Sequence, residues 1–217
     1  MKTVFHIVVL IMLGAFLGGC PSFWNTVQAP KESNADDLYQ RAEQEYKNGQ
    51  FTAAVESYEQ LKSGHPEFKK MPTVCVKIGD GLYAAKDYDR AISRYMQFLE
   101  LYPTNRFVPR VKYYIGLSYF SQIKKTDLDN ALIKRAEQCF AELAADPKGG
   151  DWAKKAEEKQ RDCKRMLAEK EFDKANTYYK MGNYAAARVA AKRVLEEYPD
   201  LGFDDQAKGI VDRVKAE

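Results

Sequence analysis

The stretch that decides the fold of this chain is residues 78–103, IGDGLYAAKDYDRAISRYMQFLELYP. It contains two amphipathic patterns at helical spacing, split at residues 86–88, and it ends at a proline, which cannot continue a helix. The second pattern has an alanine, an aromatic residue four positions later, an apolar residue three further on and a closing proline: Ala91, Tyr95, Phe98 and Pro103. The stretch therefore predicts two short antiparallel helices joined by a tight turn.

Similar offsets occur at three other places in the chain. They give Ala54, Tyr58, Leu61 and Pro66 upstream, then Ala136, Phe140, Leu143 and Pro147, and finally Ala187, Ala191, Val194 and Pro199. The first pattern recurs too, because Gly79 is matched 37 residues later by Gly116. A helix pair that cannot bury its apolar face alone gains its core from the next pair, so the repetition predicts a solenoid. In each pair the alanine allows close approach, and the residue one turn later fills the space beside it.

The pattern resembles the tetratricopeptide repeat, although the tryptophan usual early in that unit is absent. The resemblance implies an all-α, right-handed solenoid of about four helix pairs with a C-terminal capping helix. The marker alanines are 37, 45 and 51 residues apart, which exceeds the usual repeat of ~34 residues. We therefore expect two insertions, a polar loop around residues 124–132 and one long helix over residues 151–181.

From residue 34 to residue 217 we expect a single solenoid domain. The helix pairs are expected at 34–48 with 51–63, 72–86 with 88–101, 108–124 with 132–145, and 151–181 with 183–198, followed by a cap at 203–216.

The first 19 residues have the features of a secretory signal peptide. Lys2 is followed by an apolar run of about 14 residues and then by LGGC at residues 17–20. The run is shorter than the ~20 apolar residues of a membrane-spanning helix. The LGGC sequence resembles the bacterial lipobox, which implies cleavage after Gly19, a diacylglycerol and an N-acyl chain on Cys20, and a lipid-anchored protein. Pro21 in place of aspartate after the cysteine favours the outer membrane, on its periplasmic face.

Residues 20–33 contain two prolines and no helical period, so we expect a lipidated, flexible tether before the solenoid. Trp24 in this tether is expected either at the lipid interface or against the first repeat. The whole chain has 34 basic and 31 acidic residues, a near balance that argues against electrostatic capture of nucleic acid or of anionic lipid. Binding is therefore expected to depend on shape and apolar contact.

Residue types that carry catalysis or bind metals are scarce. The mature chain would keep one histidine, His65, in a Gly-His-Pro turn, which disfavours Ser-His-Asp and Cys-His arrangements. No phosphate-binding glycine motif occurs, and Cys75, Cys139 and Cys163 fit no zinc motif. Cys139 and Cys163 either form a disulfide or stay as buried thiols. We expect no enzyme activity, metal, cofactor or small-molecule substrate; a cell-wall hydrolase using paired carboxylates is the enzymatic alternative.

First helices of such a solenoid line its concave surface. With Gly79 and Gly116 setting the register, the residues expected to form a peptide-binding or partner-binding surface there are Tyr39, Glu43, Tyr46, Val76, Asp80, Tyr83, Arg110, Tyr113, Leu117 and Phe120. Aromatic side chains give large, stiff contact area at low entropic cost, which suits the binding of an extended peptide. Core packing is the alternative, because a register shift of one residue would turn several of them inward.

A lipoprotein whose mature part consists of four such units is similar to the tetratricopeptide lipoproteins of the outer-membrane β-barrel assembly machine. The likeness covers about residues 20–200 and is clearest at Cys20 and over residues 178–199. It implies that the N-terminal units recognise segments of unfolded outer-membrane proteins and that the C-terminal units dock on the barrel-bearing subunit. Those relatives end with a fifth helix pair, whereas 18 residues follow Pro199 here. A pilotin-like lipoprotein that escorts a secretin or pilus subunit is the alternative.

Overall fold

The computed structural model describes residues 34–124 and 130–215, and these residues form nine α-helices and no strand. The expected signal peptide, Cys20, the tether with Trp24 and part of the expected polar loop lie outside the described residues. The helices are α2 (Ala35–Lys47), α3 (Phe51–Gly64), α4 (Met71–Ala84), α5 (Tyr88–Leu101), α6 (Val108–Ser121), α7 (Ala131–Ala144), α8 (Asp151–Lys180), α9 (Tyr184–Glu197) and α10 (Asp204–Lys215).

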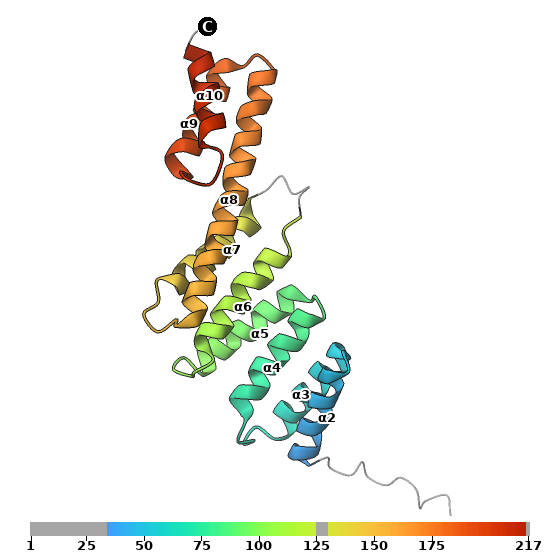
Figure 1. Cartoon of the computed structure of the whole chain (residues 1–217). Coiled ribbons are helices and arrows are strands. Elements are labelled where there is room, and N and C mark those ends of the chain that lie inside the picture. The colour runs from blue at the N-terminus through green and yellow to red at the C-terminus, as the bar shows by residue number, and fades with distance from the viewer. Residues whose placement is uncertain (1–33, 125–129, 216–217) are drawn as a thin grey trace, which may run out of the picture. The chain divides into compact units, whose positions relative to one another are not determined.

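Each helix packs against the next one along the chain, and α6 also contacts α8 (Figure 1). The helix pairs are therefore α2 with α3, α4 with α5, α6 with α7, and α8 with α9. The last helix, α10, packs on α9 and α8, in the place of a terminal cap. The all-α fold of tetratricopeptide-type repeats is confirmed.

The second helix of each pair carries the predicted core residues. The marker alanines are fully buried, and so are the residues one turn later: Ala54, Ala91, Ala136 and Ala187, with Tyr58, Tyr95, Phe140 and Ala191. The first helices have a small residue facing this position. A β-carbon added at Gly79 would lie 2.4 Å from the ring of Tyr95, and one at Gly116 would lie 2.7 Å from the ring of Phe140. Small and aromatic residues thus set the distance between the paired helices.

In three of the four helix pairs, the two helices are joined by the same kind of turn. Gly49 and Gly182 have φ angles of 76° and 75°, and Lys86, at the corresponding position, has a φ of 63°. In each turn the next residue donates its backbone N–H to a carbonyl five residues earlier, as from Asp87 to Leu82 at 2.9 Å. This is the hydrogen bond of a Schellman cap, which closes the end of a helix.

The expected long helix is confirmed as α8, which is 30 residues long. Its first half packs in one core cluster through Ala156, Cys163 and Leu167. Its second half packs in another cluster through Ala175, together with α9 and α10. The helix therefore serves both as the spacer and as the first helix of the last pair. Cys163 is a free thiol, as are Cys75 and Cys139.

The prediction that the first helix of the third pair continues to residue 124 is wrong. This helix, α6, ends at Ser121. Gln122 and Ile123 donate backbone hydrogen bonds of 3.2 Å to carbonyls three residues earlier, at Tyr119 and Phe120. Bonds of this kind tighten the last turn and end the α-helix before the polar loop.

Candidate functional site

The ten residues predicted for the binding surface lie on α2, α4 and α6, and eight of them are half-buried. Val76 and Asp80 differ, because they are only 4% and 8% exposed. The expectation that these two side chains are displayed on a surface is therefore wrong. Val76 belongs to the core cluster of the N-terminal units, and Asp80 is held by two buried or half-buried partners. The remaining eight lie at the boundary between core and solvent.

Asp80 joins three helices through its carboxylate. It accepts a hydrogen bond of 2.7 Å from the hydroxyl of Tyr95 on α5, and an ion pair of 2.9 Å from the guanidinium of Arg110 on α6. Burial and the nearby Asp80 carboxylate raise the pKa of Tyr95 well above its ordinary value. Burial alone would lower the pKa of Arg110, but the hydrogen bond and charge of Asp80 outweigh it and raise that pKa. The cluster therefore fixes the second unit against the third.

Glu43 does the same for the first two units. It accepts a hydrogen bond from the buried hydroxyl of Tyr58 on α3, and its carboxylate lies 3.2 Å from the ammonium of Lys77 on α4. Burial would raise the pKa of Glu43, but Tyr58 and Lys77 outweigh burial and hold that pKa below its ordinary value of 4.5. In the third unit Leu117 and Phe140 replace the acid and the tyrosine, so the polar cluster is replaced there by an apolar contact.

Tyrosine and tryptophan rings from three successive first helices touch one another. Tyr83 of α4 lies 5.3 Å from Tyr114 of α6, and Tyr113 of α6 lies 5.3 Å from Trp152 of α8, measured between ring centroids. Tyr113 and Tyr114 are themselves 6.0 Å apart. All four side chains are half-buried. We call these four residues the aromatic row.

Cations also lie over aromatic rings of the first helices α2, α6 and α8. The pairs are Lys70 over Tyr39, Lys77 over Tyr46, Arg110 over Tyr114, Lys155 over Trp152, and Lys159 over Phe120, at 4.4–5.1 Å from the ring centroid. We use the name first-helix face for the aromatic row together with these pairs. Half-exposed rings can contact apolar or aromatic side chains. The cations beside them can bind a carboxylate or a backbone carbonyl.

Sequence reasoning did not identify Trp152, Tyr114 or the cations of α8 as site residues. Trp152 begins the apolar series of the long helix, so its spacing indicated the core. Tyr114 follows Tyr113 directly and lies in the middle of α6, where its ring contacts Tyr83 of α4. The available signal is the residue type, since a large ring on a first helix can reach the neighbouring repeat.

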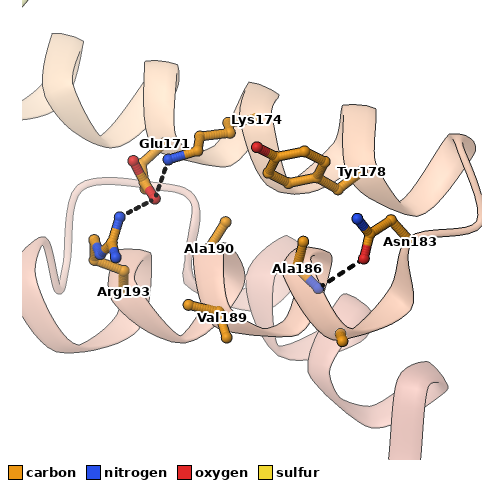
Figure 2. Close-up of a pocket in the computed structure, with 9 residues that line it drawn as sticks. Glu171, Lys174, Tyr178, Asn183, Ala186, Val189, Ala190 and Arg193 are labelled. Carbon is orange, nitrogen blue, oxygen red and sulfur yellow. Dashed lines mark hydrogen bonds and ion pairs between the residues drawn. The ribbon is translucent and has the colours of Figure 1, made fainter.

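A second candidate surface is a groove of about 470 Å³ between α8 and α9 (Figure 2). At one end Glu171 pairs with Arg193 at 2.9 Å and with Lys174 at 3.6 Å. At the other end the side chain of Asn183 caps α9 by accepting the N–H of Ala186 at 3.2 Å, and the Tyr178 ring extends from α8 toward Lys174 (Figure 2). Four apolar residues of α9 also line the groove; Ala190 among them is buried and Val189 is 59% exposed. The groove is therefore apolar along α9 and charged at one end, and we call it the C-terminal groove.

Neither a metal-binding group nor a membrane-spanning helix is found within residues 34–124 and 130–215. No group of three or more His, Cys, Asp or Glu side chains there could hold a metal ion. His65 lies in the loop between α3 and α4, where its backbone N–H caps α3 and its ring is 3.7 Å from Glu67. None of the described helices has the length and apolar character needed to cross a membrane.

Residues 31–210 match the family model YfiO, described as "Outer membrane lipoprotein". The chain is 23% identical to the outer membrane protein assembly factor BamD of Neisseria gonorrhoeae over 219 residues, covering 95% of this chain and 82% of that protein. It is 24% identical to BamD of Xylella fastidiosa (strain 9a5c), covering 81% of this chain and 66% of that protein. BamD of Vibrio cholerae is also 24% identical, with 86% and 80% covered.

The matched region contains every described helix up to the middle of α10, and with them the first-helix face and the C-terminal groove. The chain therefore belongs to the YfiO family of outer membrane lipoproteins.

Proposed function

We propose that this chain is a non-enzymatic, lipid-anchored subunit of the machinery that assembles β-barrel proteins into the outer membrane. The family match and the relatives named as outer membrane protein assembly factors support this function. The anchor would be acyl chains on Cys20, on the periplasmic face of the outer membrane. A Cys20→Ser variant should no longer incorporate labelled palmitate in cells, and acylation that persists in this variant would contradict the anchor.

The first-helix face is the proposed binding site for segments of unfolded outer-membrane proteins. The observation that carries this assignment is the aromatic row, because four half-exposed rings in mutual contact cross three repeats without being fully covered. An extended segment can lay alternate side chains against such rings. The cations beside the rings would bind its carboxylates and carbonyls.

Binding can be measured with a fluorescent unfolded outer-membrane protein held in urea and diluted into the purified chain. Replacing Tyr83 and Trp152 with alanine should weaken binding roughly tenfold or more, because central aromatics dominate such interfaces. Tyr184→Ala on α9 is the matched control, since Tyr184 is 37% exposed but lies outside the first-helix face. Unchanged binding by the double variant, with its helix content intact, would contradict the assignment.

The C-terminal groove is the proposed docking site for the barrel-bearing, BamA-like subunit. The exposed Val189 on its α9 side and its charged end fit a partner segment with a small apolar side chain followed by a polar group. A Val189→Asp variant should lose co-purification with that subunit while keeping the binding of unfolded substrate. Lys192→Asp, on an exposed position of α9 that does not line the groove, is the control.

Depletion in cells separates this function from that of a pilotin. A general fall in β-barrel proteins, porins included, is expected for an assembly subunit. Loss of a single secretin with normal porin levels would contradict the proposal and favour a pilotin-like role.

A further inference from the structure

A third cavity, of about 340 Å³, lies between the α5–α6 loop and the α7–α8 loop. It shares no lining residue with the first-helix face or the C-terminal groove. Three cationic side chains line it, Arg106, Lys112 and Lys148, together with one carboxylate, Asp146. The proposed function assigns no role to this cavity.

The charges in this cavity do not balance. The Asp146 carboxylate accepts an ion pair of 2.9 Å from Lys112 and a hydrogen bond of 3.0 Å from the backbone N–H of Lys148. Among the described residues, no carboxylate forms an ion pair with the side chain of Arg106 or of Lys148. The charge of Lys148 does act on Asp146, because after the hydrogen bond from Lys112 and that from the Lys148 backbone it helps to lower the pKa of this carboxyl. The guanidinium of Arg106 is held 4.9 Å from the centre of the Phe107 ring, at the start of α6. Two cations beside a neutralised pair leave room for one more anion.

Phosphate is the anion that this set of groups suits best. A guanidinium presents planar, paired N–H donors that match two phosphate oxygens, and an ammonium adds a compact charge. The hydroxyl of Thr104 also lines the cavity and can donate to an oxygen. Pro103, Val108 and Pro109 complete the lining. Thr104, Arg106 and Lys148 are exposed, so a headgroup can reach them from solvent.

The phosphate could belong to a lipid headgroup or be a free anion, and the position of the cavity favours the lipid. The loops before α4, α6 and α8 lie along one edge, and the first helix α2 begins on this edge as well (Figure 1). Contacts support this, because Tyr39 in the first half of α2 is 5.5 Å from Phe68 in the α3–α4 loop. Lys69 is exposed on the same edge, and so is Leu101, which is 55% exposed beside the cavity.

The edge is also the one closest in the chain to the expected lipid anchor. Cys20 precedes Ala35, the first residue of α2, by 15 residues, and an extended chain of that length spans at most about 50 Å. An acylated Cys20 would thus keep this edge within reach of the lipid surface. Basic side chains with an exposed apolar one are what a bilayer surface attracts.

We propose that the cavity formed by Arg106, Lys112 and Lys148 binds the phosphate of an anionic phospholipid headgroup. The lipid anchor then holds the chain at the membrane, and the cavity orients it, with the edge of the α3–α4, α5–α6 and α7–α8 loops against the lipid. The partner is the bilayer surface, not a protein.

The test uses residues 21–217, which keep every described helix and all three core clusters but lack the acylated cysteine. Sedimentation with phosphatidylcholine vesicles, with and without phosphatidylglycerol, measures binding. The test variant is Arg106→Gln with Lys148→Gln, which leaves the pair of Lys112 and Asp146 in place. The control is Lys47→Gln with Lys180→Gln, which removes the same charge from the last turns of α2 and α8, on the opposite edge.

We expect binding only to vesicles that contain phosphatidylglycerol, about tenfold or more weaker binding by the test variant, and little change in the control. Equal loss in both variants would overturn the site, because only net charge would then matter. If inorganic phosphate bound in the cavity but the chain did not bind vesicles, the ligand would be free phosphate and not a lipid headgroup, which would overturn the proposal. The chain could instead bind an acidic peptide such as polyglutamate, lose this binding in the test variant and not bind vesicles. That result would overturn the proposal and identify the cavity as a protein interface.

Discussion

Gly79 on α4 lies so close to Tyr95 on α5 that a β-carbon at residue 79 would be 2.4 Å from Cε1 of the ring. Gly116 has the same relationship to Phe140 in the next unit, at 2.7 Å. Glycine in the middle of a helix costs up to about 1 kcal/mol relative to alanine. These two glycines are explained by the size of the ring that faces them, since no side chain fits in the space.

Gly79→Ala should therefore destabilise the chain by about 1–3 kcal/mol, because the ring or the helix has to shift. Urea denaturation measures the loss as a lower midpoint. Gly209→Ala on α10 is the matched control, because it also lies inside a helix but no atom lies within 4 Å of its added β-carbon. The control should be neutral or slightly stabilising. A Gly79→Ala variant as stable as the parent would contradict the close approach.

Lys86→Gly should stabilise the chain. Lys86 has a φ of 63°, in the left-handed region, at the turn position where the first and last pairs have glycine. A side chain in this region costs roughly 1 kcal/mol, part of which is offset by the greater freedom of glycine in the unfolded chain. Thermal unfolding should show a rise of a few degrees.

The reverse change provides the control for this turn. Gly49→Lys places a side chain at φ 76° in the first pair and should lower the melting temperature by a similar amount. If Lys86→Gly were destabilising, the side chain of Lys86 would have to make a contact that outweighs its backbone strain.

Most of the fold could be predicted from the spacing of small and aromatic residues, because the same pattern recurs at each interface between paired helices. The offsets from Ala91 to Tyr95 and Phe98 determine one interface, and their recurrence determines the others. Helix ends were predicted to within one residue before Gly49 and Pro103. The helix expected to end at residue 86 ends at Ala84, because Lys86 itself has a left-handed backbone conformation that stops it. The end of α6 could not be predicted, because it depends on hydrogen bonds of the last turn.

The candidate site could be predicted only in part. Sequence periodicity gives the face of a single helix, and it placed the tyrosines correctly on first helices. It does not give the twist between repeats, which brings Arg110 to Asp80 and Trp152 to Tyr113. For the same reason it put Asp80 on an open surface, although Tyr95 and Arg110 cover it.

Glu43→Gln should reduce stability by about 1 kcal/mol at pH 7, because Tyr58 and Lys77 lose a charged partner. The pKa of Glu43 is lowered in the folded chain from its ordinary value of 4.5. The stabilisation by the ionised carboxylate is thus fully present above about pH 4.5 and is lost as the pH falls through the lower, folded-state pKa.

Denaturation midpoints of this variant and of the parent should therefore differ at neutral pH and converge as the pH falls below about 4.5. Glu56→Gln, at an exposed position of α3, is the control and should change stability by less than about 0.5 kcal/mol. A gap between Glu43→Gln and the parent that stays constant down to pH 3 would show that the carboxylate stabilises the fold by packing and not by its charge.

The third unit supplies a test of the Asp80 cluster, because Leu117 there takes the position of Asp80 and Phe140 that of Tyr95. Asp80→Leu alone leaves the buried Tyr95 hydroxyl and the Arg110 guanidinium without their acceptor, which should cost about 3 kcal/mol or more. Tyr95→Phe alone removes one donor and should cost about 1 kcal/mol.

The two changes together should cost at least about 1 kcal/mol less than the sum of the single changes, because the double variant leaves no orphaned hydroxyl. Combining Asp80→Leu with Tyr102→Phe is the control, since Tyr102 makes no contact with Asp80, and these effects should simply add. Urea denaturation of the parent, the three single variants and the two double variants completes both cycles. Additive costs for Asp80→Leu and Tyr95→Phe would mean that carboxylate and hydroxyl stabilise the helix pair independently, which the 2.7 Å hydrogen bond between them contradicts.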